Sequence, residues 1–125
     1  VPLIKAARQL NDDMINYYAD KVGRITKNKK NGKVGVIGLS YREGVKEKAY
    51  SRSVDLIRLL KDKGYEVYGL DPLYTNDEIK NEFKVKCLDN LKKMDAIVLM
   101  NKESRYRKDL LKLKGKVVDV KNVLK

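Results

Sequence analysis

The feature that most constrains the fold is a change in hydrophobic period near residue 32. Before that point, apolar residues recur at spacings of three and four, which is typical of one face of a long helix. After it, short apolar runs bounded by Gly, Pro or Asn alternate with helix-like segments. Alternating strands and helices favour right-handed crossovers and a parallel sheet covered on both faces. The sequence therefore predicts an α/β fold, a Rossmann-like doubly wound parallel sheet preceded by a long N-terminal helix.

The N-terminal segment predicts one helix over residues 3–27. Its apolar stripe consists of Leu3, Ala7, Leu10, Met14, Tyr18, Val22 and Ile25, widened by Ile4 and Ile15. About 25 residues at 1.5 Å each make a rod of roughly 37 Å, longer than a compact domain of the remaining residues can cover. We therefore expect the chain to dimerise through Leu3, Ala7, Leu10, Met14 and Tyr18. Residues 1–30 are expected to form a helix with its linker, and residues 31–125 the domain.

The later elements follow from the same patterns. The predicted strands are 33–38, 65–70, a short one near Val85, 96–100 and 116–120. The predicted helical segments are one capped by Ser51 or Ser53 that stops at Gly64, 76–83, a turn over 88–93, and 105–111.

Composition excludes several classes of function. The chain has 125 residues, 42% hydrophobic and 37% charged, which suits one globular core and is too short for a cofactor domain plus a substrate domain. It contains no histidine and one cysteine, so Ser-His-Asp and Cys-His catalysis and a conventional zinc site are not expected. Its apolar runs are far shorter than the roughly 20 residues of a membrane span. Because a secretory signal is missing as well, we expect a cytoplasmic protein without a membrane partner.

The formal net charge is +12, and the positive residues are spread along the chain. A scattered pattern favours a lysine-rich solvated surface, as in many thermophile proteins, over a nucleic-acid interface. A nucleic-acid binder would need a one-sided patch and a steep salt dependence of binding.

The loop after the first predicted strand is the strongest candidate site. Ligands of doubly wound sheets bind outside the carboxyl ends of the strands. In this loop Gly38 allows close backbone approach, Ser40 and Arg42 can hold an anion, and Tyr41 can stack on a base. Gly35 and Gly38 do not have the spacing of a G-x-G-x-x-G fingerprint. The residue types alone leave phosphate binding and a plain strand-to-helix turn equally open.

Two other residues have competing interpretations. Asp71, 33 residues after Gly38, either contacts a ribose or forms an Asp-Pro turn, and the turn is favoured. Cys87 is either a reactive thiol or a structural one. Its position between a predicted strand and helix favours a half-buried structural thiol.

Three blocks of sequence point to a known family. They are 33–42 (KVGVIGLSYR), 51–56 (SRSVDL) and 64–72 (GYEVYGLDP). Segments 94–99 and 117–124 agree in order, and 7–12 (ARQLND) is similar to a long dimerisation helix. Together they resemble the C-terminal domain of the UDP-glucose/GDP-mannose dehydrogenase family and the end of its central helix. The closest subgroup is the one that oxidises UDP-N-acetylmannosamine or a related UDP-N-acetylhexosamine.

The resemblance implies a role. Members of the family oxidise the C6 alcohol of a nucleotide sugar to a carboxylate in two NAD-dependent steps, and their products serve polysaccharide biosynthesis. Their NAD domain and catalytic cysteine precede the long helix, so this chain is expected to start after both. It would bind a UDP-sugar, hold no NAD or metal of its own, and contain no catalytic residue.

The resemblance also assigns site residues. A phenylalanine-lysine pair near the bound UDP-sugar falls on Tyr41 and Arg42, beside Ser40. A terminal arginine falls on Lys121, which keeps the charge but loses the bidentate fork. Residues 48–52 (KAYSR) stand where the family has a Thr-Arg-Glu-Ser-Pro-like run, so the arginine, glutamate and proline of that run are replaced. Residues 101–103 (NKE) replace a Thr-x-His-like turn. These departures leave open a degenerate, non-catalytic assembly domain on the same scaffold.

Overall fold

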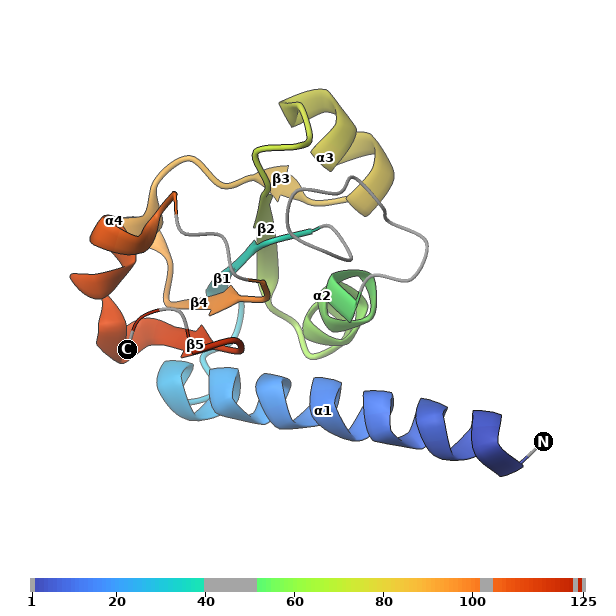
Figure 1. Ribbon diagram of the computed structural model, residues 1–125. Helices are drawn as coiled ribbons and strands as arrows, with labels where there is room; N and C mark the ends of the chain where they lie inside the picture. The colour runs from blue at the N-terminus through green and yellow to red at the C-terminus, as the bar shows by residue number, and fades with distance from the viewer. Residues whose placement is uncertain (1, 40–51, 102–104, 123, 125) are drawn as a thin grey trace.

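A parallel sheet forms the centre of the computed structural model, which describes residues 2–39, 52–101, 105–122 and 124 (Figure 1). The strands of the described ranges are β1 Lys33–Ile37, β2 Glu66–Leu70, β3 Lys86–Cys87, β4 Ala96–Leu99 and β5 Val117–Asp119. They lie in the order β3-β2-β1-β4-β5, and each neighbouring pair is parallel. This order, with β1 at the centre and the chain growing outwards to both sides, confirms the predicted Rossmann-like doubly wound sheet.

Helical segments precede and connect the strands. They are α1 Pro2–Thr26, α2 Arg52–Asp62, α3 Asn76–Phe83, η1 Leu91–Lys93, α4 Arg107–Leu111 and η2 Lys114–Lys116, where η marks a 3₁₀ turn. The boundaries of α3 agree with the prediction because Thr75 and Glu78 form a capping box, each side chain accepting the other's backbone N–H. One detail is corrected: Ser53 is not the cap of α2 but its second residue.

The sheet is buried on both faces. On one face, α1, α2 and α3 pack against it, as Figure 1 shows for α2. The residues of this cluster include Val22, Leu56, Ile79, Val34, Val36 and Val98. On the opposite face, Leu110 of α4 packs with a second group that includes Leu88, Met94, Ile37, Ile97 and Leu99. Burial on both faces explains why β1 and β4 are continuous apolar runs rather than alternating ones.

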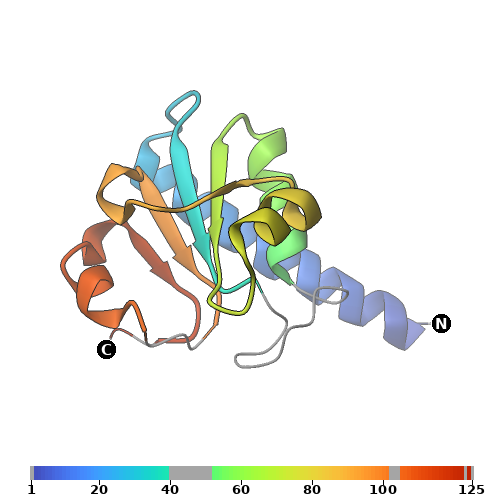
Figure 2. The same ribbon diagram turned by 90° about the horizontal axis from the view of Figure 1, so that it is seen from above.

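The long helix α1 divides into two parts. Its C-terminal half contributes Ile15, Tyr18, Ala19 and Val22 to the core beneath the sheet. Its N-terminal end extends past α2 and the rest of the domain (Figures 1 and 2), and the Leu10 side chain is 65% exposed. The predicted long helix is confirmed, and half of it belongs to the same core as the sheet. The division of the chain at residue 30 stays a prediction.

No helix in the ranges that the structure describes is both long enough and apolar enough to cross a membrane.

Candidate functional site

The carboxyl ends of β1, β2 and β4 converge at one edge of the sheet. Gly38 follows β1 and donates its backbone N–H to the carbonyl of Leu70, the last residue of β2, over 3.0 Å. Met100 follows β4 and donates to the carbonyl of Ile37 over 2.9 Å. These bonds continue the sheet past its last ladder pairs. They bring the segments after three strands to a single place, which is where a doubly wound fold binds its ligand.

Gly38 is required at this edge for two reasons. Its φ is +91°, in the region that L side chains rarely adopt. A Cβ on Gly38 would also lie 2.6 Å from the carboxamide of Asn101, a buried residue two positions after the last residue of β4. The glycine thus lets the segments that follow β1 and β4 approach each other closely. The sequence prediction at Gly38 concerned the approach of a ligand to the backbone, and it stays a prediction.

Asp71 joins the ends of β1 and β2. The residue is 3% exposed. Its Oδ2 accepts the backbone N–H of Leu39 over 2.8 Å, and its Oδ1 accepts the backbone N–H of Leu73 over 2.8 Å. The bond to Leu73 is that of an Asx turn, which supports the turn interpretation of Asp-Pro. The bond to Leu39 was missed by sequence reasoning, because it spans 32 positions of the chain.

Ser53 brings the start of α2 to the same edge. Its side chain is buried, and its Oγ donates to the carbonyl of Gly38 over 2.6 Å. Residues 38–39 and 52–53 flank the segment that contains the predicted ligand residues. The contacts of Gly38, Leu39 and Ser53 therefore fix both points at which that segment joins the fold. Apart from a serine near a helix start, no local sequence signal indicates this bond.

The predicted substrate residues fall in two places. Ser40, Tyr41 and Arg42 lie outside the described residues, directly after Leu39. Lys121 lies at the carboxyl end of β5 and is exposed. The backbone there is held by Val120, which donates to Leu99 over 3.1 Å. Lys121 thus shares the edge of the sheet with Gly38, two strands away in the order of the sheet.

The predicted dimer residues have different environments. Leu3 and Ala7 lie in the first turns of α1, and their side chains are outside what the structure describes. Leu10 is exposed, whereas Met14 is partly buried and packs against the core. Tyr18 is 8% exposed and belongs to the chain's own core. Among the predicted dimer residues whose side chains the structure describes, Leu10 is therefore the most exposed.

Cys87 has the environment of a structural thiol. Its Sγ lies 3.0 Å from Oδ1 of Asn76, to which it can donate. Burial raises the pKa of the Cys87 thiol, and the nearby Asp89 carboxylate adds to the shift. Both effects disfavour the thiolate, which is the nucleophilic form. In the described ranges, no group of three or more His, Cys, Asp or Glu residues could hold a metal ion.

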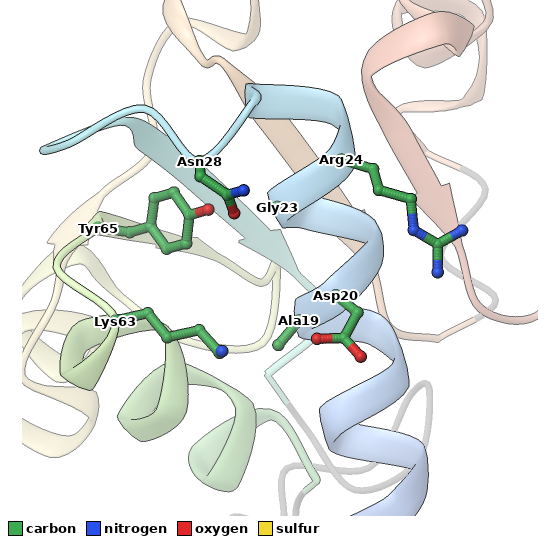
Figure 3. A pocket seen from close by; sticks show the side chains of 7 residues that line it. All are labelled: Ala19, Asp20, Gly23, Arg24, Asn28, Lys63 and Tyr65. Carbon is green, nitrogen blue, oxygen red and sulfur yellow. The ribbon is translucent and has the colours of Figure 1, made fainter.

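A pocket of about 310 Å³ lies at the opposite edge of the sheet, between the end of α1 and the turn before β2 (Figure 3). Tyr65 and Asn28 close its upper part; the Tyr65 hydroxyl is 3.0 Å from Thr26 Oγ1. The Asn28 side chain lies against Gly23: a Cβ added to Gly23 would come within 2.7 Å of Asn28 Oδ1. Arg24 extends away from Lys63 and Tyr65. The polar groups in the upper part of this pocket thus terminate α1 and join it to the sheet.

Comparison with known proteins gives consistent matches. A family model described as the UDP-glucose/GDP-mannose dehydrogenase family, UDP binding domain, matches residues 35–125. The UDP-N-acetyl-D-mannosamine dehydrogenase of Methanocaldococcus jannaschii is 32% identical over 132 residues, covering 98% of this chain and 30% of that protein. The enzyme of the same name from Methanococcus aeolicus is 31% identical over 134 residues, with the same coverage. The chain therefore spans about 30% of the length of these relatives.

Two solved structures share the fold. A UDP-glucose dehydrogenase from the hyperthermophilic archaeon Pyrobaculum islandicum superposes with a TM-score of 0.71 at 22% identity, covering 82% of this chain and 25% of that one. The UDP-N-acetyl-mannosamine dehydrogenase Cap5O of S. aureus gives a TM-score of 0.70 at 24% identity, covering 99% and 30%. At these identities the likeness concerns the fold.

Proposed function

The chain belongs to the UDP-glucose/GDP-mannose dehydrogenase family, whose UDP-binding domain it matches, and from this premise we propose that it binds the UDP-sugar of an NAD-dependent 6-dehydrogenase. In that reaction the C6 alcohol of the sugar is oxidised to a carboxylate. The observation that carries the proposal is the match over residues 35–125, which includes every segment that meets at the carboxyl edge of the sheet.

The proposed ligand residues are Ser40, Tyr41, Arg42 and Lys121. Arg42 and Lys121 supply positive charge for the diphosphate, and the Ser40 hydroxyl supplies a hydrogen-bond donor. Tyr41 provides an aromatic surface for the uracil base or the sugar. The support from the structure is that residue 39, immediately before this group, is held at the carboxyl edge, and that Lys121 lies at the same edge.

We propose UDP-N-acetylmannosamine or a related UDP-N-acetylhexosamine as the sugar nucleotide. The support is that the relatives from two methanogens bear the name UDP-N-acetyl-D-mannosamine dehydrogenase. In this proposal the redox steps, NAD and the catalytic cysteine belong to the dehydrogenase outside these 125 residues. The chain's own contribution is to bind and orient the nucleotide, which is consistent with its lack of histidine and with the disfavoured thiolate of Cys87.

We also propose that α1 forms a homodimer. Leu10 is 65% exposed, and the N-terminal end of α1 extends beyond the domain, so a second copy of the helix could cover this apolar stripe. Leu3 and Ala7 continue the same stripe at helical spacing. Because Tyr18 already packs inside its own chain, the proposed interface is centred on Leu10 rather than spread along the whole stripe.

The test of the binding site is a titration with UDP of the wild type and two arginine variants. Arg42→Ala removes a charge-assisted contact worth roughly 1.5–3 kcal/mol, which weakens binding roughly 10- to 150-fold. Arg24→Ala is the matched control, since it removes the same charge from an exposed position at the opposite edge of the sheet. Equal weakening in both variants would show that diffuse charge, not a formed site, attracts UDP. Strong self-association without UDP binding would instead support a non-catalytic assembly domain.

A further inference from the structure

We propose that Asp71 is a positioning residue for the nucleotide-sugar site, an inference that rests on the proposed function. The carboxylate of Asp71 is buried between the ends of β1 and β2. It accepts one backbone N–H from Leu39 and one from Leu73, each over 2.8 Å. Leu39 is the residue directly before Ser40. Asp71 thus holds the last described residue before the proposed ligand group.

The other end of the segment is held by a second bond. Ser53 Oγ donates to the carbonyl of Gly38 over 2.6 Å, and both groups are buried. Asp71, which follows β2, and Ser53, in the first turn of α2, therefore hold adjacent residues: Asp71 accepts from Leu39, and Ser53 donates to Gly38. A ligand contact made by residues 40–42 depends on where this junction lies, because a displacement of about 1 Å is enough to impair a preorganised site.

The hydrogen bonds that Asp71 accepts from Leu39 and Leu73 use both oxygens of a carboxylate. Each oxygen of the carboxylate accepts an N–H from a different segment of the backbone, Leu39 on Oδ2 and Leu73 on Oδ1. An asparagine has the same shape but offers a single oxygen, and its NH₂ group would face the other backbone N–H. Asp71→Asn therefore leaves one buried donor without its acceptor, and the local backbone must move to satisfy it.

Asp95, the residue before β4, offers a matched control because it holds the amino end of β1. Its Oδ2 accepts the backbone N–H of Lys33, the first residue of β1, over 2.8 Å. Its Oδ1 accepts from Lys29 Nζ over 3.3 Å. Asp95→Asn therefore perturbs a carboxylate that also holds the β1 backbone, but at the amino edge of the sheet, away from the proposed ligand residues.

The experiment compares UDP affinity in the wild type, Asp71→Asn and Asp95→Asn, at a temperature where urea unfolding shows all three to be folded. Both variants are expected to lose stability. Asp71→Asn is expected to weaken UDP binding by roughly fivefold or more, the equivalent of about one hydrogen bond, while Asp95→Asn stays within about twofold of the wild type. Equal affinity in the wild type and Asp71→Asn, or equal weakening in both variants, overturns the proposal.

A second variant and a second readout complete the test. Ser53→Ala removes the neighbouring hydrogen bond to Gly38 and is expected to weaken UDP binding in the same way. This variant replaces Asp71→Asn in the test if Asp71→Asn does not fold. Amide hydrogen exchange at Leu39 reports the junction without ligand, and it is expected to accelerate in Asp71→Asn and not in Asp95→Asn. If the wild type does not bind UDP, the proposed function fails. Exchange at Leu39 that is unchanged in Asp71→Asn overturns the positioning role by itself.

Discussion

Lys33 donates its backbone N–H to Oδ2 of Asp95 over 2.8 Å, so that the residue before β4 holds the first residue of β1. Lys29 adds an ion pair to the same carboxylate at 3.3 Å. The amino edge of the sheet is therefore fastened by a backbone-to-carboxylate bond, as Asp71 fastens the carboxyl edge. The two aspartates hold opposite ends of the central strand.

The contacts of Asp95 predict a loss of stability in acid. The Lys33 N–H, followed by Lys29, holds the pKa of the Asp95 carboxyl below its ordinary value of 3.8. A lowered pKa in the folded state means that the stabilising contribution is present above the ordinary pKa and disappears as the pH falls through the folded value. The free-energy difference between the wild type and Asp95→Asn in urea unfolding should therefore be complete above pH 3.8 and shrink as the pH falls below it. A difference that does not change with pH would contradict this assignment.

Gly38 and Gly64 separate two effects of an alanine substitution. Both have positive φ, +91° and +94°, so alanine costs roughly 1–3 kcal/mol of strain at either position. A Cβ at Gly38 also meets the Asn101 carboxamide at 2.6 Å, whereas a Cβ at Gly64 comes within 4 Å of no atom of the described residues, its chain neighbours aside. Gly38→Ala should therefore lower the urea midpoint more than Gly64→Ala. Equal midpoints in the two variants would rule out the close approach to Asn101.

Tyr68 predicts an unusual alkaline titration. Its hydroxyl donates to Glu66 over 2.6 Å, and this bond, with burial, raises the pKa of Tyr68 to about 12. The contribution of this raised pKa to stability is complete below pH 10 and is lost as the pH rises toward 12. Subtracting the ultraviolet absorbance titration of Tyr68→Phe from that of the wild type should give a curve with its midpoint near pH 12. Glu66→Gln should move the midpoint toward 10, and an unchanged midpoint would mean that Glu66 is not the cause.

The exposed part of α1 predicts a concentration-dependent dimer. Leu10→Asp places a charge at the centre of the proposed interface and should raise the dimer dissociation constant roughly tenfold or more. Light scattering over a concentration series measures this change. Leu111→Asp on α4 is the control, since Leu111 is 36% exposed but lies far from α1 in sequence. A monomeric wild type, or equal effects of both substitutions, would contradict dimerisation through α1.

Much of the fold could be predicted from periodicity. The run Ala96–Leu99 and the capping box at Thr75 are local signals, and the structure has a strand and a helix where these signals lie. The alternation of strands and helices predicted a parallel sheet with right-handed crossovers, and the strands of the sheet are parallel. The end of α2 was predictable from Gly64 for the same local reason, because this glycine adopts positive φ two residues after Asp62, the last residue of the helix.

The details of the site could not be predicted in the same way. The bond between Asp71 and Leu39 joins residues 32 positions apart, and that between Ser53 and Gly38 joins residues 15 apart. Such contacts depend on how neighbouring strands align at their ends, which no local pattern encodes. The turn at Asp71 could be predicted from the Asp-Pro pair, because the hydrogen bond that forms the turn joins Asp71 to Leu73, only two residues away.

The central claim is that this chain forms a site for a UDP-sugar, and calorimetric titration tests it most directly. The purified chain is titrated with UDP, UDP-N-acetylmannosamine and NAD at two salt concentrations, since salt screens diffuse attraction to a chain of net charge +12 but affects a formed site much less. We predict that UDP and the UDP-sugar bind at both salt concentrations and that NAD does not. Binding of NAD in preference to UDP, or UDP binding that vanishes at high salt, would contradict the account.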